Sequence, residues 1–221
     1  GDALAYAGRI AEGVDAVRKA VRDELRKGAD QIKIMVSGGV SSPHDPLERN
    51  QYSPDEIKVI VEEAERRGTY VMAHAYGADA IRVALECGVR TIEHGNLIDQ
   101  ETAELAARKS AYLVPTLVTY RVLSDTAPDS GWSESMLGKL DLVKSKGLDA
   151  IKICRDAGVK IGFGTDLLGD SFDAQSDEFL VRSAVEHPAD ILHSATVINA
   201  EILNMQGELG SIPEKAIADI I

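Results

Sequence analysis

The chain has 221 residues, of which 27% are charged and 44% hydrophobic, and this is the composition of an ordinary globular protein. Asp and Glu outnumber Lys and Arg by 36 to 24, which argues against nucleic acid as a partner because phosphate binding favours clustered cations. No apolar stretch approaches the roughly 20 residues needed to span a bilayer, and no signal-peptide pattern opens the chain. We therefore expect no membrane association and a cytoplasmic location.

Helix-like and strand-like segments alternate along the chain, which predicts a parallel sheet covered by helices. The first helix is expected near 14–27, with one apolar face formed by Val14, Val17, Val21 and Leu25. The second begins at Ser53-Pro54-Asp55-Glu56, where an N-cap serine and a glutamate form a capping box. Further helices are expected at 78–87, 99–109, 133–157, 174–186 and 190–205. Strands are expected at 31–36, 69–74, 89–94, 111–116 and 159–165.

Two connections, 37–52 and 117–132, are the longest between a predicted strand and the helix that follows it. Long loops in compact domains are often functional. The first follows the strand that carries Lys33, and the second contains Tyr120 and Arg121. We expect both connections to lie on the face where the strands end.

Four polar residues stand at or near the ends of predicted strands, namely Lys33, His74, His94 and Asp166. In a parallel α/β barrel these ends converge on one face. A charged lysine inside an apolar strand is costly to bury, and reaction of its neutral amine with carbon dioxide gives a carbamate that can bridge two divalent metals. Histidines suit zinc-like ions, and Asp166 supplies a hard oxygen. The pattern predicts a metal-centred hydrolase.

The strings around these residues resemble the amidohydrolase superfamily, and the resemblance spans nearly the whole chain. The successive polar positions are 41, 20 and 72 residues apart. The matching strings are Ile32-Lys33-Ile34 with Ser37-Gly38-Gly39, Ala73-His74-Ala75-Tyr76-Gly77, Ile92-Glu93-His94-Gly95-Asn96, Pro115-Thr116-Leu117 and Gly164-Thr165-Asp166.

The resemblance implies a (β/α)8 TIM-barrel-type metal-dependent hydrolase, of which this chain would hold about strands four to eight. Five predicted strands are too few for a closed barrel, which usually needs about 250 residues, so we expect a larger protein with material missing at both ends. Residues 1–206 would be the C-terminal part of the barrel, and 207–221 would begin the return to a small β domain. Exposed sheet edges would favour a homo-oligomer.

Within the superfamily the chain is most similar to the imidazolonepropionase-like and Xaa-Pro dipeptidase-like branch, which includes metallocarboxypeptidases. This implies hydrolysis of an amide in a small molecule or short peptide, with two divalent ions, zinc being expected. By resemblance, Lys33 would be the carboxylated bridging ligand, and His74 and His94 would bind the second metal. Asp166 would hold the first metal and accept a proton. The family's His-x-His pair of the first strand has no counterpart here.

Three further residues are candidate substrate contacts. Tyr76, two residues past His74, should face the same cleft and hydrogen-bond a carbonyl or carboxylate. Tyr120 and Arg121 could clamp a substrate carboxylate from their loop. Strand alternation predicts that Glu93 points away from His94.

Three alternatives stay open. The protein could be a cyclic amidohydrolase of the imidazolonepropionase type. It could be a class I aldolase in which Lys33 forms a Schiff base and Ser37-Gly38-Gly39 binds phosphate, although this leaves the two histidines unexplained. It could also be an inactive fragment that cannot hold two metals.

Overall fold

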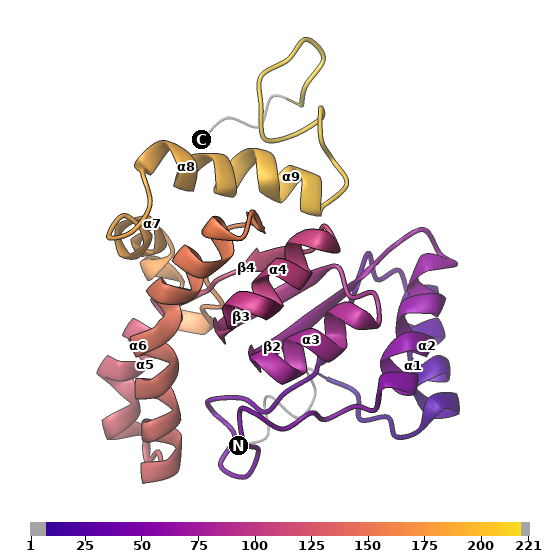
Figure 1. Ribbon diagram of the computed structural model, residues 1–221, viewed down its shortest axis with the longest axis horizontal. Helices are drawn as coiled ribbons and strands as arrows, with labels where there is room; N and C mark the ends of the chain where they lie inside the picture. Colours follow the sequence, from indigo (N-terminus) through magenta and orange to yellow (C-terminus); the bar gives the residue numbers. More distant parts are fainter. Residues whose placement is uncertain (1–7, 218–221) are drawn as a thin grey trace.

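Five parallel strands form one sheet in the order β1-β2-β3-β4-β5 in the computed structural model, which describes residues 8–217 (Figure 1). Each strand pairs with the next one along the chain. The predicted parallel α/β sheet is therefore confirmed, with consecutive strands as neighbours, as repeated βα units require. The strands are β1 (Ile32–Met35), β2 (Val71–Gly77), β3 (Thr91–Leu97), β4 (Tyr112–Val114) and β5 (Lys160–Ile161).

Helices connect the strands and cover the outer face of the sheet; α3 and α4 lie directly over the strands in Figure 1. The longer helices are α1 (Val14–Arg26), α2 (Pro54–Glu65), α3 (Ala78–Glu86), α4 (Gln100–Arg108), α5 (Leu117–Thr126) and α6 (Glu134–Asp156). Three short ones follow: α7 (Asp177–Arg182), α8 (Pro188–His193) and α9 (Asn199–Ile202). No helix within residues 8–217 is long and apolar enough to cross a membrane.

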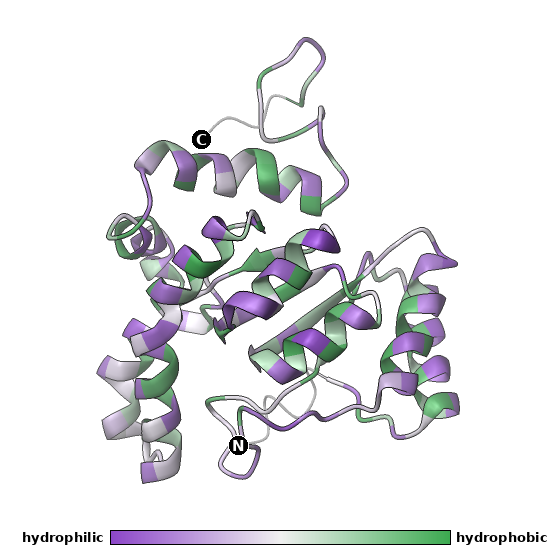
Figure 2. Cartoon of the chain, viewed as in Figure 1, coloured by the Kyte–Doolittle hydropathy of each residue, from purple (hydrophilic) through white to green (hydrophobic). Residues whose placement is uncertain are grey.

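The first two helices form as their sequences predict. Helix α1 buries Val17, Val21 and Leu25 on one side, and its other faces are hydrophilic (Figure 2). Helix α2 begins with the predicted capping box, because the Ser53 hydroxyl accepts from the Glu56 amide and the Glu56 carboxylate accepts from the Ser53 amide. These local signals fix the start of α2 one residue after the serine.

The segment 117–132, predicted as a loop, instead contains α5 and a 3₁₀ turn, Ala127–Ser130. Its N-terminal amide groups are capped from a distant part of the chain, since the Val118 amide donates to Oε2 of Glu178 at 2.7 Å. Thr116, the local N-cap residue, makes no side-chain capping bond within the described structure. The loop prediction was wrong, and Tyr120 and Arg121 lie on a helix.

The C-terminal helices are shorter and more broken than predicted. The segment 174–186 contains only α7, preceded by a 3₁₀ turn at Gly169–Ala174. A π-helical turn, Ser194–Ile198, joins α8 to α9. The predicted return segment is described only up to residue 217, where the Ile217 amide donates to the Glu208 carbonyl; residues 218–221 lie outside the described residues.

The two faces of β1 differ sharply. Ile32 and Ile34 are buried among the apolar side chains of α1 and α2, whereas Lys33 and Met35 point to the other face and are exposed, Met35 by 44%. This alternation agrees with the predicted sides of the strand. The expectation that Lys33 is buried was wrong, because the inner face of the sheet is open at β1 in the described structure.

Candidate active site

The structure brings the two predicted histidines together in the middle of two neighbouring strands. The ring centroids of His74, on β2, and His94, on β3, lie 4.6 Å apart with an interplanar angle of 75°. His94 has a φ of 75°, a left-handed conformation that is rare for residues other than glycine. Residues held in such sparsely populated backbone conformations cluster at functional sites.

Glu93 shares the inner face with His74, its register partner on β2. The expectation that Glu93 points away from the site was wrong. Left-handed geometry at His94 interrupts regular alternation, so both Glu93 and His94 contribute to this face. Oε1 of Glu93 accepts a hydrogen bond of 2.6 Å from the Thr91 hydroxyl, and burial raises the pKa of its carboxyl.

Burial keeps both imidazoles neutral. It lowers the pKa of His74 to about 4, with a smaller contribution from the Lys33 ammonium. It lowers the pKa of His94 well below its usual value, and the charges of His74 and Lys33 act in the same direction. Neutral imidazole is the form that binds metal ions.

The hydroxyl of Thr116 orients the ring of His94. Its Nδ1 lies 2.8 Å from the Thr116 hydroxyl, which leaves Nε2 as the nitrogen directed elsewhere. Such a bond fixes the orientation of a ligand imidazole. Tyr76 stacks on the same ring, with centroids 5.1 Å apart and planes 16° apart. Thr116 falls within a string that resembles the superfamily, but sequence reasoning gave it no role.

Two buried tyrosines lie beside this pair. The Tyr120 hydroxyl is 3.2 Å from the Tyr76 hydroxyl and 3.2 Å from Oδ1 of Asn96. The Asn96 amide in turn donates to the Val143 carbonyl at 3.0 Å. Burial raises the pKa of both phenols, so Tyr76 and Tyr120 are neutral hydrogen-bond donors at neutral pH. The prediction that Tyr76 faces the site agrees with this arrangement; Asn96 was missed.

Lys33 and Asp166 complete the predicted group. The charge of Lys33 is close enough to lower the pKa values of both histidines and of Asp166. Desolvation has the larger effect on Asp166 and raises the pKa of its carboxyl. Asp166 has a left-handed φ of 52°, and its carbonyl accepts a bond of 3.2 Å from the Thr119 hydroxyl. The ammonium of Lys33 therefore acts electrostatically on both histidines and on Asp166.

Arg121 differs from its predicted setting. It lies on α5 rather than in a loop, and its guanidinium forms an ion pair with Asp177. The pair is partly exposed. Arg121 is therefore committed to a carboxylate of this chain in the described structure.

The loop after β1 contacts the site, as expected for the connection 37–52. The Gly38 carbonyl lies 3.3 Å from Nε2 of His74, and the Ser37 hydroxyl accepts from the Tyr76 amide at 3.1 Å. Lys139, on α6, holds this loop through its ammonium, which donates to the carbonyls of Gly39 at 2.9 Å, Asp45 at 3.1 Å, and Ser42. Sequence reasoning missed Lys139, which no local motif marks.

The donors of the site suit a divalent ion, although the set is incomplete. Within residues 8–217, no three His, Cys, Asp or Glu side chains lie close enough together to form a metal-binding group. Two adjacent neutral imidazoles, one of them oriented by a hydroxyl, nevertheless have the chemistry that zinc-like ions require. The two imidazoles by themselves would suit one ion.

Consecutive parallel strands joined by helices are the architecture of a TIM-barrel-type α/β fold. The chain belongs to the amidohydrolase family, whose sequence profile matches residues 3–221. The resemblance inferred from the sequence is thereby confirmed.

Individual proteins with known names are similar to this chain. Ochratoxinase of Aspergillus niger is 35% identical over 213 residues, which cover 96% of this chain and 44% of that protein. A solved prolidase complexed with N-methylphosphonate-L-proline is 52% identical with a TM-score of 0.93, over 96% of this chain and 52% of that chain. A Xaa-Pro dipeptidase with methionine bound in its active site is 32% identical with a TM-score of 0.87, over 94% and 52%. This chain spans about half the length of these relatives.

Proposed function

We propose that this chain forms the catalytic part of a metal-dependent hydrolase that cleaves an amide or peptide C–N bond in a dipeptide or an acylated amino acid. The observation that carries the proposal is the neutral pair of His74 and His94, which lie together on adjacent strands beside the buried phenols of Tyr76 and Tyr120. Similarity to a prolidase and to a Xaa-Pro dipeptidase favours a peptide substrate with a small C-terminal residue such as proline.

Two divalent ions, zinc by preference, would be held by residues of this site. His74 and His94 would hold one ion, and Asp166 would contribute to the other. Lys33, as a carbamate formed with carbon dioxide, would bridge the two; its exposed amine is accessible for that reaction. When bound, such ions polarise a carbonyl and lower the pKa of water toward neutrality.

The side chains of this chain would move the proton. The Asp166 carboxylate would accept a proton from the water whose oxygen bonds to the substrate carbonyl carbon. The same carboxyl then delivers the proton to the nitrogen as the C–N bond breaks. Asp166 thus ends each cycle ionised.

Substrate would be oriented by the tyrosines. The Tyr76 hydroxyl would donate to a carbonyl or carboxylate oxygen, and its burial excludes competing water. The Tyr120 hydroxyl would do so only after leaving its partners Tyr76 and Asn96. Arg121 would reach a substrate carboxylate only after leaving Asp177.

The test is hydrolysis of a panel of Xaa-Pro dipeptides and acylated amino acids by the complete natural polypeptide that contains this chain. We expect activity that a chelator removes and that zinc or manganese restores. Asp166→Asn should lower kcat at least 1000-fold, whereas the matched variant of an exposed carboxylate, Asp170→Asn, should not. Activity that survives both the chelator and D166N would contradict the proposal, as would borohydride trapping of a carbonyl substrate on Lys33.

A further inference from the structure

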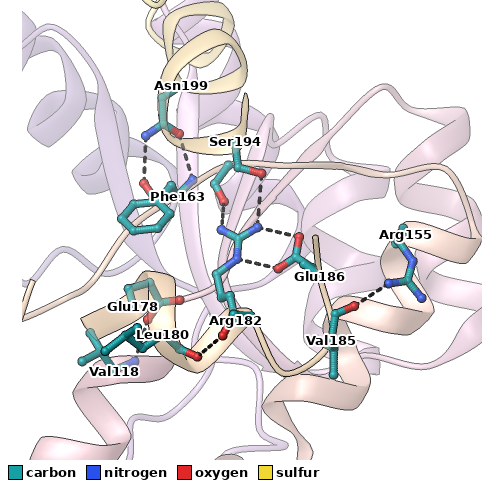
Figure 3. Close-up of polar contacts among 12 residues, drawn as sticks. Val118, Arg155, Phe163, Glu178, Leu180, Arg182, Val185, Glu186, Ser194 and Asn199 are labelled. Atoms are coloured by element: carbon teal, nitrogen blue, oxygen red, sulfur yellow. Dashed lines mark hydrogen bonds and ion pairs between the residues drawn. The ribbon is translucent and has the colours of Figure 1, made fainter. Parts of the chain in front are cut away.

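A buried guanidinium, that of Arg182, lies beside Glu186 and Ser194 (Figure 3). The Arg182 side chain is 0% exposed, and its Nε and Nη2 donate to the two carboxylate oxygens of Glu186 at 2.6 and 2.8 Å. Nη2 also lies 3.1 Å from the Ser194 hydroxyl. The remaining nitrogen, Nη1, donates to the Gly162 carbonyl at 2.8 Å. The guanidinium therefore connects α7 to the end of β5.

Asn199 makes a second, two-point contact with the same segment. Its Oδ1 accepts from the Phe163 amide at 2.9 Å, and its Nδ2 donates to the Phe163 carbonyl at 2.9 Å (Figure 3). This is the bonding pattern that a neighbouring strand would supply. The sheet itself reaches only to Gly162, whose amide donates to the Leu113 carbonyl at 2.8 Å. Beyond Gly162, the side chain of Asn199 forms the backbone hydrogen bonds that a neighbouring strand would otherwise form.

The far end of the segment is tied to α5. The Thr119 hydroxyl donates to the Asp166 carbonyl, and Glu178 caps the first turn of the same helix through the Val118 amide. The π-helical turn begins at Ser194 and ends just before Asn199, and both of these residues contact this region. π-Helical turns occur frequently at functional sites.

We propose that Asn199 and Arg182 are positioning residues for Asp166. Their hydrogen bonds to the backbone of Gly162 and Phe163 fix the position of the Asp166 carboxylate, which lies three residues further along the chain. The left-handed φ of Asp166 requires such support, because a strained conformation persists only where its surroundings determine it. The inference rests on the proposed function for the role of the carboxylate, but the geometry of the segment can be measured without activity.

The first test is amide hydrogen exchange at Phe163 in the 221-residue chain. Asn199→Ala removes both bonds and should speed exchange of this amide at least tenfold. Asn199→Asp keeps the acceptor for that amide and should speed it less. The control is Val59→Ala, a destabilising change in the buried face of remote helix α2. Exchange that is no faster in N199A than in V59A would overturn the proposal.

The second test is kinetic and uses the complete natural polypeptide. N199A should lower kcat at least tenfold while KM stays within twofold and the metal content is retained. N199D should fall between N199A and the natural enzyme, and V59A should leave kcat unchanged. A decrease in kcat no larger in N199A than in V59A would overturn the role in positioning. If neither the natural enzyme nor any variant hydrolyses the substrates, this result counts against the proposed function alone. The hydrogen-exchange experiment would still decide whether Asn199 holds the segment.

Discussion

Two buried polar regions flank the end of the sheet, and they differ in how completely their polar groups are hydrogen-bonded. Around His74 and His94, burial is compensated only in part, and the pKa of each imidazole is displaced downward. Around Arg182, every nitrogen of the guanidinium donates to a carboxylate, a hydroxyl or a carbonyl. A displaced pKa indicates a site where a bound ligand would supply the interaction that the buried group lacks. Complete hydrogen bonding of a buried group indicates a structural role.

Removal of the guanidinium should give the largest effect on stability. Arg182→Met leaves the Glu186 carboxylate, which is 6% exposed, without its partner, and we expect a loss of about 3–5 kcal/mol in the free energy of unfolding. Urea denaturation at pH 7 measures it. Arg155→Met, which removes a partly exposed guanidinium bound to the Val185 carbonyl, should cost less than about 1 kcal/mol. Equal losses in the two variants would contradict the distinction between the regions.

The histidine pair should make the protein less stable in acid. Because the pKa of His74 is lowered to about 4 in the folded state, the unfolded chain binds a proton first as pH falls from about 6.5. The contribution of His74 is therefore present above pH 6.5 and is lost toward pH 4, by on the order of 3 kcal/mol. His74→Asn should remove this part of the slope when unfolding is followed with a chelator present. His44→Asn, which removes an imidazole at an exposed loop position, serves as the control.

Glu178 should give the opposite slope. Burial raises the pKa of its carboxyl to about 7, and Oε1 has no hydrogen-bond partner among the described residues. The folded state thus holds its proton longer than the unfolded chain, and stability is lost as pH rises from about 4.5 to 7, again by on the order of 3 kcal/mol. Glu178→Gln retains an acceptor for the Val118 amide and should be more stable than the natural chain above pH 7. A variant that is less stable at pH 8 would show that the ionised carboxylate is the better cap.

Lys139 should have the smallest effect, because its ammonium is only partly buried. Lys139→Met removes three bonds to loop carbonyls and should lower the free energy of unfolding by about 1–2 kcal/mol. Amide exchange in residues 38–45 should rise at the same time. Lys144→Met, an exposed lysine on the same helix, should change neither quantity. Unchanged exchange in the loop would show that Lys139 does not hold it.

Local signals were enough to predict much of the fold. The capping box at Ser53 and the apolar stripe of α1 depend on residues within one or two turns. The capping box was predicted correctly, and so was the stripe except for Val14, which is 36% exposed. Helix α5 was missed because its cap, Glu178, lies 60 residues further along the chain. A single sequence shows no local sign of a cap that arrives from another helix.

The site was predicted through residue types at strand ends, and its details depend on the backbone. His74, His94 and Tyr76 were identified because strand alternation and resemblance agreed. The inward position of Glu93 was missed because the left-handed φ of His94 follows from the tertiary structure rather than from a local pattern. Lys33 was expected to be buried because apolar neighbours surround it in sequence, but exposure depends on what covers the inner face.

The π-helical turn makes the chain between α8 and α9 sensitive to length. An α-helix advances about 100° per residue, so deletion of one residue from 194–198 would restore a regular helix and rotate everything after it by about that angle. The amide of Asn199 would then face away from Phe163. Insertions and deletions should consequently be far less tolerated in these five positions than amino-acid replacements at the exposed ones among them.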